Sequence, residues 1–232
     1  MNMGKKCIIY GAGEHISYIA QPSQGDLSIA ADGGYKFALA NGIHIDAVIG
    51  DFDSLGYTPS EVQAIKLPVE KDETDMLAAV KYGMAYGYAE FHIFGGTGGR
   101  LDHTLANIQL LAYLCQHHCA GFLYSSEQIA TCIQDSAISF DEAFCGTISV
   151  LSYSPAAYGV TIKGLKYSLD DSMLSNIYPL GVSNSFIGQA SEISAKSGML
   201  LVCYSLPERA IEAASSQLML KGPKSAPNIK NT

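Results

Sequence analysis

The stretch Ala47-Val48-Ile49-Gly50-Asp51-Phe52-Asp53-Ser54 places two aspartates directly after a short apolar run. The length and the β-branched residues of that run predict a buried strand over residues 47–50. If the backbone stays extended beyond this strand, Asp51 and Asp53 leave the chain on the same side. Two carboxylates about 4 Å apart repel each other by roughly 1 to 4 kcal/mol, so we expect Mg²⁺ between them. A polar turn is the alternative explanation of these residues.

The composition is that of a soluble globular protein with room for one large domain or two small ones. Of the 232 residues, 48% are hydrophobic and 16% are charged, and the formal net charge is −8. This charge argues against a nucleic-acid partner, because binding to a phosphate backbone depends on clustered Lys and Arg. The six cysteines contain no CxxC pair, which indicates reduced thiols. No signal peptide or membrane span is recognisable, so we expect a cytoplasmic protein with no membrane partner.

The first half of the chain alternates predicted strands with predicted helices. This alternation predicts an α/β fold with a doubly wound, mostly parallel sheet and helices on both faces. In such sheets, ligands bind beyond the carboxyl ends of the strands. The predicted strands are residues 7–10, 27–31, 47–50, 67–69, 91–94 and 121–124. The predicted helices are residues 14–20, 35–40 and 59–66, a helix that begins within residues 71–75 and ends at Gly87, and a helix that begins at Leu101.

Local signals predict where these helices begin and which faces they bury. Thr58-Pro59 supplies an N-cap followed by a proline at the first helical position, which predicts the helix over 59–66. Asp72 is the expected N-cap of the next helix. The helix after residue 100 has one apolar stripe, which we expect to be its buried face. The stripe consists of Leu101, Leu105, Ile108, Ala112 and Cys115.

From about residue 126 the pattern changes to short β-branched or alternating runs punctuated by turn residues. This pattern predicts a C-terminal all-β sandwich domain. The expected organisation is therefore an α/β nucleotide- and metal-binding domain over residues 1–125, a β-sandwich domain over 126–206, and a partly mobile extension over 207–232. Within the extension, a helix is expected over 207–220.

Two further segments fall in strand-to-helix connections, on the same predicted sheet edge as Asp51. In Lys71-Asp72-Glu73-Thr74-Asp75, Asp75 offers a third carboxylate for the metal and Lys71 can neutralise a phosphate. In Gly95-Gly96-Thr97-Gly98-Gly99-Arg100, the glycines allow a polyphosphate to approach backbone N–H groups. Arg100 adds a charged planar fork at the start of a helix, where the dipole also favours anions. A helix cap and a surface loop are the alternative explanations.

Four motifs in this order resemble the thiamine pyrophosphokinase family. They are DGG at 32–34, GDFDS at 50–54, KDETD at 71–75 and GGTGGRLDH at 95–103, and Ser183-Asn184-Ser185 resembles the short thiamine-contacting motif of the family. The resemblance implies an α/β nucleotide domain, a C-terminal β-sandwich, and a homodimer with thiamine bound across the subunit interface. It also implies that Mg²⁺ assists the transfer of a pyrophosphoryl group from ATP to the thiamine hydroxyl, which yields thiamine diphosphate and AMP.

By position, the resemblance assigns roles to individual residues. The implied metal ligands are Asp51, Asp53 and Asp75, and Arg100 would hold the migrating group. Either Asp102 or Asp53 could act as the base. The implied nucleotide-site residues are Asp32, Gly33, Lys71, Asp72, Thr74, Gly95, Gly96, Thr97, Gly98, Gly99 and Arg100. The implied thiamine-site residues are Ser183, Asn184 and Ser185, with Asp102 beside the hydroxyl.

Two other functions are compatible with parts of the pattern. A phosphohydrolase of the haloacid dehalogenase type also has a DxD after a strand, but it leaves the glycine-rich segment without a role. A nucleotide sensor that binds without turnover uses that segment but does not need clustered carboxylates. Incubation with ATP, Mg²⁺ and thiamine distinguishes the three functions. A pyrophosphokinase forms AMP, a phosphohydrolase releases inorganic phosphate, and a sensor forms no product.

Overall fold

The computed structural model describes residues 4–15, 21–70 and 72–205. The chain divides into two compact units between Cys132 and Ile133, inside strand β7. Each unit is described by itself. Within the described residues, the helices are too short or too polar to cross a membrane.

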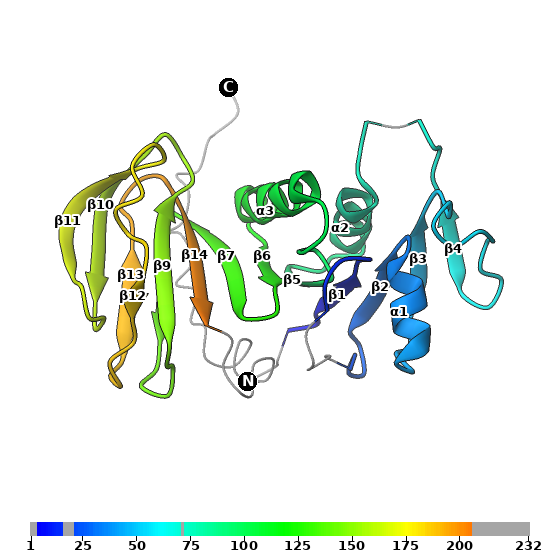
Figure 1. The fold of residues 1–232 in the computed structure, drawn as a ribbon, viewed down its shortest axis with the longest axis horizontal. Helices are drawn as coiled ribbons and strands as arrows, with labels where there is room; N and C mark the ends of the chain where they lie inside the picture. Colours follow the sequence, from blue (N-terminus) through cyan, green and yellow to red (C-terminus); the bar gives the residue numbers. More distant parts are fainter. Residues whose placement is uncertain (1–3, 16–20, 71, 206–232) are drawn as a thin grey trace, which may run out of the picture. The chain divides into compact units, whose positions relative to one another are not determined.

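Unit 1 is built on a parallel sheet with one antiparallel strand at its end (Figure 1). The order of its strands is β7-β6-β5-β1-β2-β3-β4. Their side chains are buried almost throughout except in the edge strand β4, which is typical of a parallel sheet covered on both faces. The strands are β1 (Cys7–Tyr10), β2 (Leu27–Ala31), β3 (Ala47–Gly50), β4 (Gln63–Lys66), β5 (Glu90–Phe94), β6 (Ala120–Tyr124) and β7 (Gln128–Gln134).

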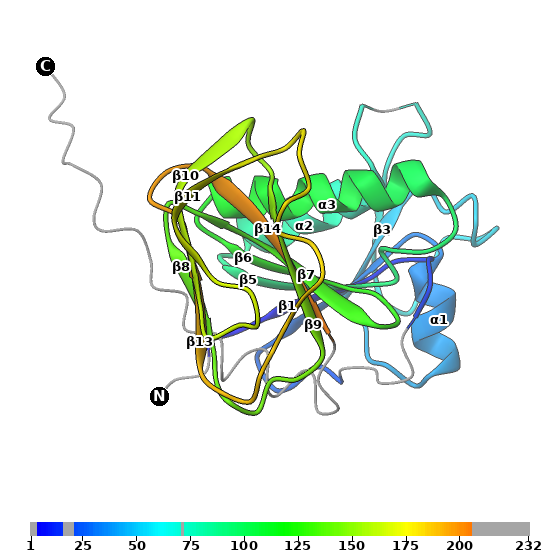
Figure 2. The same cartoon turned by 60° about the vertical axis from the view of Figure 1, so that its left-hand side comes forward.

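Among the residues that the structure describes, three helices cover this sheet: α1 (Gly34–Ala40), α2 (Asp75–Ala85) and α3 (Leu101–Gln116). Figures 1 and 2 show α2 and α3 together on one face, whereas α1 lies on the other. The chain builds outward from β1 in both directions, first through β2, β3 and β4 and then through β5 and β6. The carboxyl end of β1 therefore lies at a topological switch point, where doubly wound sheets bind ligands. The predicted fold class is confirmed.

The helix predicted over 59–66 is wrong. Residues 63–66 form β4, which pairs in parallel with β3 from Ala47 opposite Gln63 to Gly50 opposite Lys66. The strand expected at residues 67–69 is therefore also wrong, because the strand of this region is β4, which ends at Lys66. The cap signal at Thr58-Pro59 was outweighed because an open sheet edge offers the backbone a full ladder of hydrogen bonds. Most of the helix predicted over 14–20 lies outside the described residues.

The expected N-cap of α2 is also corrected. Thr74, not Asp72, caps the helix, because its Oγ1 accepts a hydrogen bond from the N–H of Leu77 at 3.1 Å. Asp75 is then the first helical residue and places its carboxylate at the positive end of the helix. Residue Asp72 is exposed.

Helix α3 begins at the predicted residue, but part of its predicted buried face is wrong. Leu101 and Leu105 are 71% and 54% exposed. The helix instead packs on β6 through Leu111 and Leu114, at Gly121, where an added Cβ would lie 2.7 Å from Leu114 Cδ1. Because Gly121 contacts only the second half of α3, the first turns of this helix are not packed on β6. These first turns border the cleft described below.

Unit 2 contains two antiparallel sheets, ordered β12-β9-β14 and β11-β10-β13-β8. An aromatic cluster of Phe140, Phe144, Phe186 and Tyr204 fills the space between them, with ring centroids 5.0 to 6.0 Å apart. The predicted sandwich is confirmed, although β11 was not predicted, and the helix expected over 207–220 lies outside the described residues. The strands are β8 (Ala137–Phe140), β9 (Thr147–Ser152), β10 (Ala156–Lys163), β11 (Leu169–Ser175), β12 (Asn184–Ser185), β13 (Ser191–Ser194) and β14 (Met199–Ser205).

Candidate active site

A cleft of about 680 Å³ opens at the carboxyl ends of β1, β2, β3 and β5 in unit 1. Three groups of residues line it: aspartates that follow β2 and β3 or begin α2, glycine-rich loops that follow β1 and β5, and the first turns of α3. The lining residues used below are Gly11, Gly13, Asp32, Asp51, Asp53, Thr74, Asp75, residues 95–100, His103 and Asn107.

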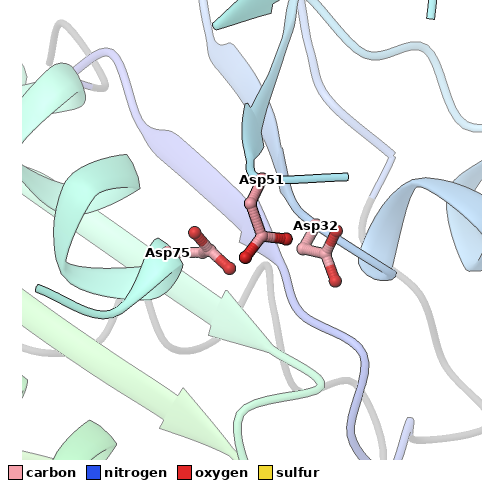
Figure 3. Close-up of side chains that lie close together, drawn as sticks. All are labelled: Asp32, Asp51 and Asp75. Atoms are coloured by element: carbon pink, nitrogen blue, oxygen red, sulfur yellow. The ribbon is translucent and has the colours of Figure 1, made fainter. Parts of the chain in front are cut away.

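Asp32, Asp51 and Asp75, here called the acidic cluster, bring three carboxylates together in this cleft (Figure 3). One oxygen from each lies within 4.8 Å of the others, and all three residues are half-buried. At an effective dielectric constant near 20, each such pair repels by about 3 to 4 kcal/mol. The Oδ1 atom of Asp32 is buried and has no hydrogen-bond partner in the described part of the chain. A buried carboxylate oxygen without a hydrogen-bond partner, in a residue beside two other carboxylates, is compatible with a bound hard cation.

The backbone at the ends of β2 and β3 explains why the cluster forms. The Asp32 N–H donates to the carbonyl of Ile49 at 2.8 Å, so the two strand ends are tied together. A side chain at Gly50 would place its Cβ 2.9 Å from the Cβ of Asp32, so glycine permits this approach. Asp32 itself has a φ of +42°, a strain of about 1 to 3 kcal/mol for a residue that is not glycine. Strain of this kind is characteristic of functional sites.

The structure places Asp53 outside the acidic cluster, contrary to the expected set of Asp51, Asp53 and Asp75. Phe52 has a φ of +65°, so the backbone does not stay extended and the two aspartates do not leave the chain side by side. The N–H of Asp53 donates to Asp51 Oδ1 at 3.1 Å, and its exposed carboxylate accepts from the Ser54 hydroxyl at 3.1 Å. Asp53 still lines the cleft. Asp32, predicted as a nucleotide-site residue, takes its place in the cluster.

The loop of residues 95–99, here called the glycine loop, also lines the cleft. It packs against the turn after β1 through backbone hydrogen bonds: the N–H of Gly13 donates to Gly95 O at 2.8 Å, and the N–H of Glu14 donates to Thr97 O at 2.7 Å. A side chain at Gly11 would place its Cβ 2.6 Å from the Gly95 carbonyl oxygen. The glycines after β1 therefore support the glycine loop.

Arg100 and Asp102 form a bidentate ion pair at the start of α3. Arg100 Nη2 lies 2.6 Å from Asp102 Oδ2, and Nε lies 3.1 Å from Oδ1. Arg100 holds the pKa of the Asp102 carboxyl below its usual value, which makes this group a weaker base. Both side chains are exposed, so the pair can open when an anion approaches Arg100.

The remaining predicted residues of unit 1 differ in their placement. Thr74 lines the cleft and caps α2, and Gly33 lies just beyond Asp32. Lys71 lies outside the described residues. Sequence reasoning missed Gly11, Gly13, His103 and Asn107 as cleft residues. A 3.6-residue period from Arg100 would have found the two on α3.

In unit 2, Ser183 precedes strand β12, whose residues Asn184 and Ser185 pair with Ile148 and Thr147 of β9. Asn184 is 5% exposed; its Oδ1 accepts from the N–H groups of Tyr167 and Ser185 at 2.9 Å each, and its Nδ2 donates to Tyr167 O at 2.6 Å. The residue in the left-handed region is Ser183, with a φ of +64°. Asn184 holds Tyr167, whereas Ser183 is exposed and Ser185 is half-buried.

Comparisons with known proteins point to one family. A model described as the catalytic domain of thiamin pyrophosphokinase matches residues 21–123, and a model described as its vitamin B1 binding domain matches residues 135–200. Together they span well over half of the chain. Thiamine pyrophosphokinase from Bacillus subtilis (strain 168) is 28% identical over 185 residues, which cover 76% of this chain and 86% of that protein.

Solved structures of the same name share the fold. The crystal structure of thiamine pyrophosphokinase from Bacillus subtilis superposes with a TM-score of 0.77 at 25% identity and covers 87% of this chain and 99% of its own. The yeast thiamin pyrophosphokinase structure has a TM-score of 0.71 at 16% identity and covers 90% of this chain and 89% of its own. The second similarity supports the fold alone.

The acidic cluster leads to a prediction about metal affinity. Asp32→Asn should weaken Mn²⁺ binding by at least about tenfold, because the substitution removes a charge and an anionic ligand. Asp53→Asn is the matched control and should bind Mn²⁺ within about twofold of the unaltered protein. Calorimetric titration of each protein measures both. Strong loss in the Asp53 variant with none in the Asp32 variant would restore the set expected from sequence.

Proposed function

The chain belongs to the thiamine pyrophosphokinase family, and we propose that its unit 1 cleft transfers a pyrophosphoryl group from ATP to the hydroxyl of thiamine. The observation that carries this proposal is that the acidic cluster and the glycine loop line one cleft. The phosphohydrolase and sensor alternatives find no support in the comparisons.

The glycine loop and the start of α3 suit the polyphosphate of ATP. Gly95, Gly98 and Gly99 have φ values of +63°, +76° and +65°, which turn the backbone sharply and leave no side chains in the way of phosphates. The 16-residue helix α3 begins directly after the loop, so the positive end of its dipole faces the same region. Arg100 can exchange Asp102 for a phosphate, since bidentate binding suits both anions.

The acidic cluster fits Mg²⁺, with Asp32, Asp51 and Asp75 as the proposed ligands. All three offer hard oxygen donors, and the orphaned Asp32 Oδ1 is an observation that a bound cation would explain. When bound, the ion neutralises charge on the phosphate oxygens. The protein's own contribution is to hold these carboxylates close together despite their repulsion, with Gly50 permitting the approach.

The transfer itself requires one bond to form and one to break. The thiamine hydroxyl oxygen bonds to the β-phosphorus of ATP, AMP leaves, and the hydroxyl proton passes to a base. Asp102 is less suited to that role because it is not among the described residues that line the cleft. We therefore assign the base to Asp53, whose exposed carboxylate lines the cleft and accepts only a serine hydroxyl among the described contacts.

Thiamine recognition is assigned to unit 2. The family model for vitamin B1 binding covers Ser183-Asn184-Ser185. Because the amide of Asn184 is bonded to Tyr167 and Ser185, its proposed role is to shape this surface, and the hydroxyl groups of Ser183 and Ser185 are the proposed polar contacts. The six cysteines are free thiols, which suits the reducing cytoplasm as the proposed location.

A homodimer whose subunits share each thiamine site is also proposed. Unit 2 exposes large apolar side chains on β10, on β11 and in the segments that follow each strand, and exposed apolar side chains that form a patch mark protein interfaces. Ile177, 89% exposed, is the most prominent. The others are Tyr158, Tyr167, Met173, Tyr178, Leu180, Val182 and Ile187.

The activity prediction is that ATP, Mg²⁺ and thiamine yield AMP and thiamine diphosphate. Asp51→Asn should lower kcat by at least about a hundredfold, because the charge that develops during transfer loses stabilisation. Asp53→Asn should also slow transfer, whereas Glu127→Gln, an exposed change in unit 1 outside the cleft, should not. Chromatography of the nucleotides and thiamine esters measures the products formed by the unaltered protein and by each of the three variants. Release of inorganic phosphate without thiamine diphosphate would contradict the proposed function.

The dimer prediction concerns mass in solution. The 24.7 kDa chain should sediment as a species of twice that mass. Replacing Ile177 and Leu180 together by aspartate should shift it toward the monomer, because buried charges oppose association. Leu39→Asp is the control, since Leu39 is 51% exposed on α1 of unit 1. A monomeric unaltered chain at micromolar concentration would rule the dimer out.

A further inference from the structure

Asn107 has no role in the motifs or in the mechanism above, yet it occupies an unusual position. It lies on α3, is 7% exposed, and is the one buried polar side chain among the described residues that line the cleft. Its Nδ2 donates a hydrogen bond to the carbonyl oxygen of Gly96 at 2.6 Å. This bond joins the helix to the middle of the glycine loop across 11 residues of sequence.

Packing alone does not account for an asparagine at this place. The other large buried side chains of α3 are Leu110, Leu111 and Leu114, and an apolar residue would continue that face. A buried amide is costly unless it is hydrogen-bonded, so its presence implies that the bond itself matters. The bond partner is a loop carbonyl and not another helix residue.

The glycine loop needs such an anchor. Three of its residues have positive φ, and glycine-rich backbone has more conformations to lose on ordering than any other. Because the peptide group is planar and trans, fixing the direction of the Gly96 carbonyl also fixes the direction of the Thr97 N–H. Gly96 is enclosed on the sheet side, where an added Cβ would lie 2.7 Å from Leu123 Cδ1 and 3.1 Å from Ile93 Cγ2. Apolar enclosure restricts the position of Gly96, and the hydrogen bond selects its orientation.

We propose that Asn107 is a positioning residue that sets the glycine loop in the conformation that receives the polyphosphate of ATP. The identity of the ligand, ATP, rests on the proposed function. The effect of Asn107 on the conformation of the glycine loop does not. Asn107 acts through the Gly96 carbonyl, and the backbone groups of the loop then meet the phosphates already oriented, without ordering at the moment of binding.

The test is Asn107→Asp, which keeps the shape of the side chain but makes its hydrogen-bond donor depend on pH. An ionised carboxylate cannot donate to Gly96 O, whereas a protonated carboxyl can. Burial raises the pKa of the introduced group above that of an ordinary aspartate. Relative to the unaltered protein, kcat/KM for MgATP should be lower by on the order of tenfold at pH 8.5 and should recover as the pH falls through that raised pKa.

Two control variants separate positioning from general damage. Asn107→Leu has no donor at any pH, so its loss relative to the unaltered protein should be similar at each pH. Asn41→Asp is the matched amide: Asn41 Nδ2 donates to Phe37 O at 2.8 Å on the exposed end of α1, and its variant should follow the unaltered profile. A role confined to folding would produce no recovery at low pH.

Amide hydrogen exchange gives a readout that needs no activity. In the Leu variant, and in the Asp variant at pH 8.5, peptides covering residues 95–99 should exchange faster than in the unaltered protein at the same pH. Unchanged exchange in a protein with native circular dichroism overturns the proposal, as does a loss of kcat/KM that does not recover. If the Asp variant does not fold, exchange in the Leu variant decides. If the unaltered chain forms no thiamine diphosphate, the proposed function is refuted. Amide hydrogen exchange of residues 95–99 then still tests whether Asn107 orders the glycine loop.

Discussion

The mutual repulsion of Asp32, Asp51 and Asp75 is the constraint on which the rest of the site depends. Three carboxylates within 4.8 Å of one another oppose folding unless the surrounding structure holds them there and a cation offsets their charge. The fold accepts this cost at one edge of a parallel sheet, where strand ends and a helix start converge. The glycine loop lies at the same edge. The proposed binding sites for the cation and for the phosphates are therefore formed by adjacent elements of unit 1.

Small residues make this convergence possible. Gly50 allows β2 and β3 to bring Asp32 beside Asp51, and Gly11 and Gly13 let the turn after β1 support the glycine loop. On the other side of that loop, Asn107 reaches from α3 to the Gly96 carbonyl. The cleft is therefore formed by close backbone contacts and a few polar anchors, which suits a reaction that depends on positioning and charge neutralisation.

The parts that could be predicted from sequence follow from periodicity and connectivity. Alternating strands and helices predicted the doubly wound sheet, and the location of Asp32, Asp51, Asp53 and the glycine loop in strand-to-helix connections predicted that they would share an edge. The errors arise where tertiary contacts override local signals. A positive φ at Phe52 turns Asp53 away from the cluster, and pairing with β3 makes residues 63–66 a strand. Gly121 draws the second half of α3, not Leu101, onto the sheet.

The most direct measurement is a crystal structure with Mn²⁺ and a non-hydrolysable ATP analogue, because anomalous scattering locates the ion independently of any assumption about its ligands. We expect the anomalous peak between the carboxylates of Asp32, Asp51 and Asp75, with the polyphosphate lying against residues 95–99. A peak bound by Asp53 without Asp32, or a polyphosphate bound outside the unit 1 cleft, would contradict the account.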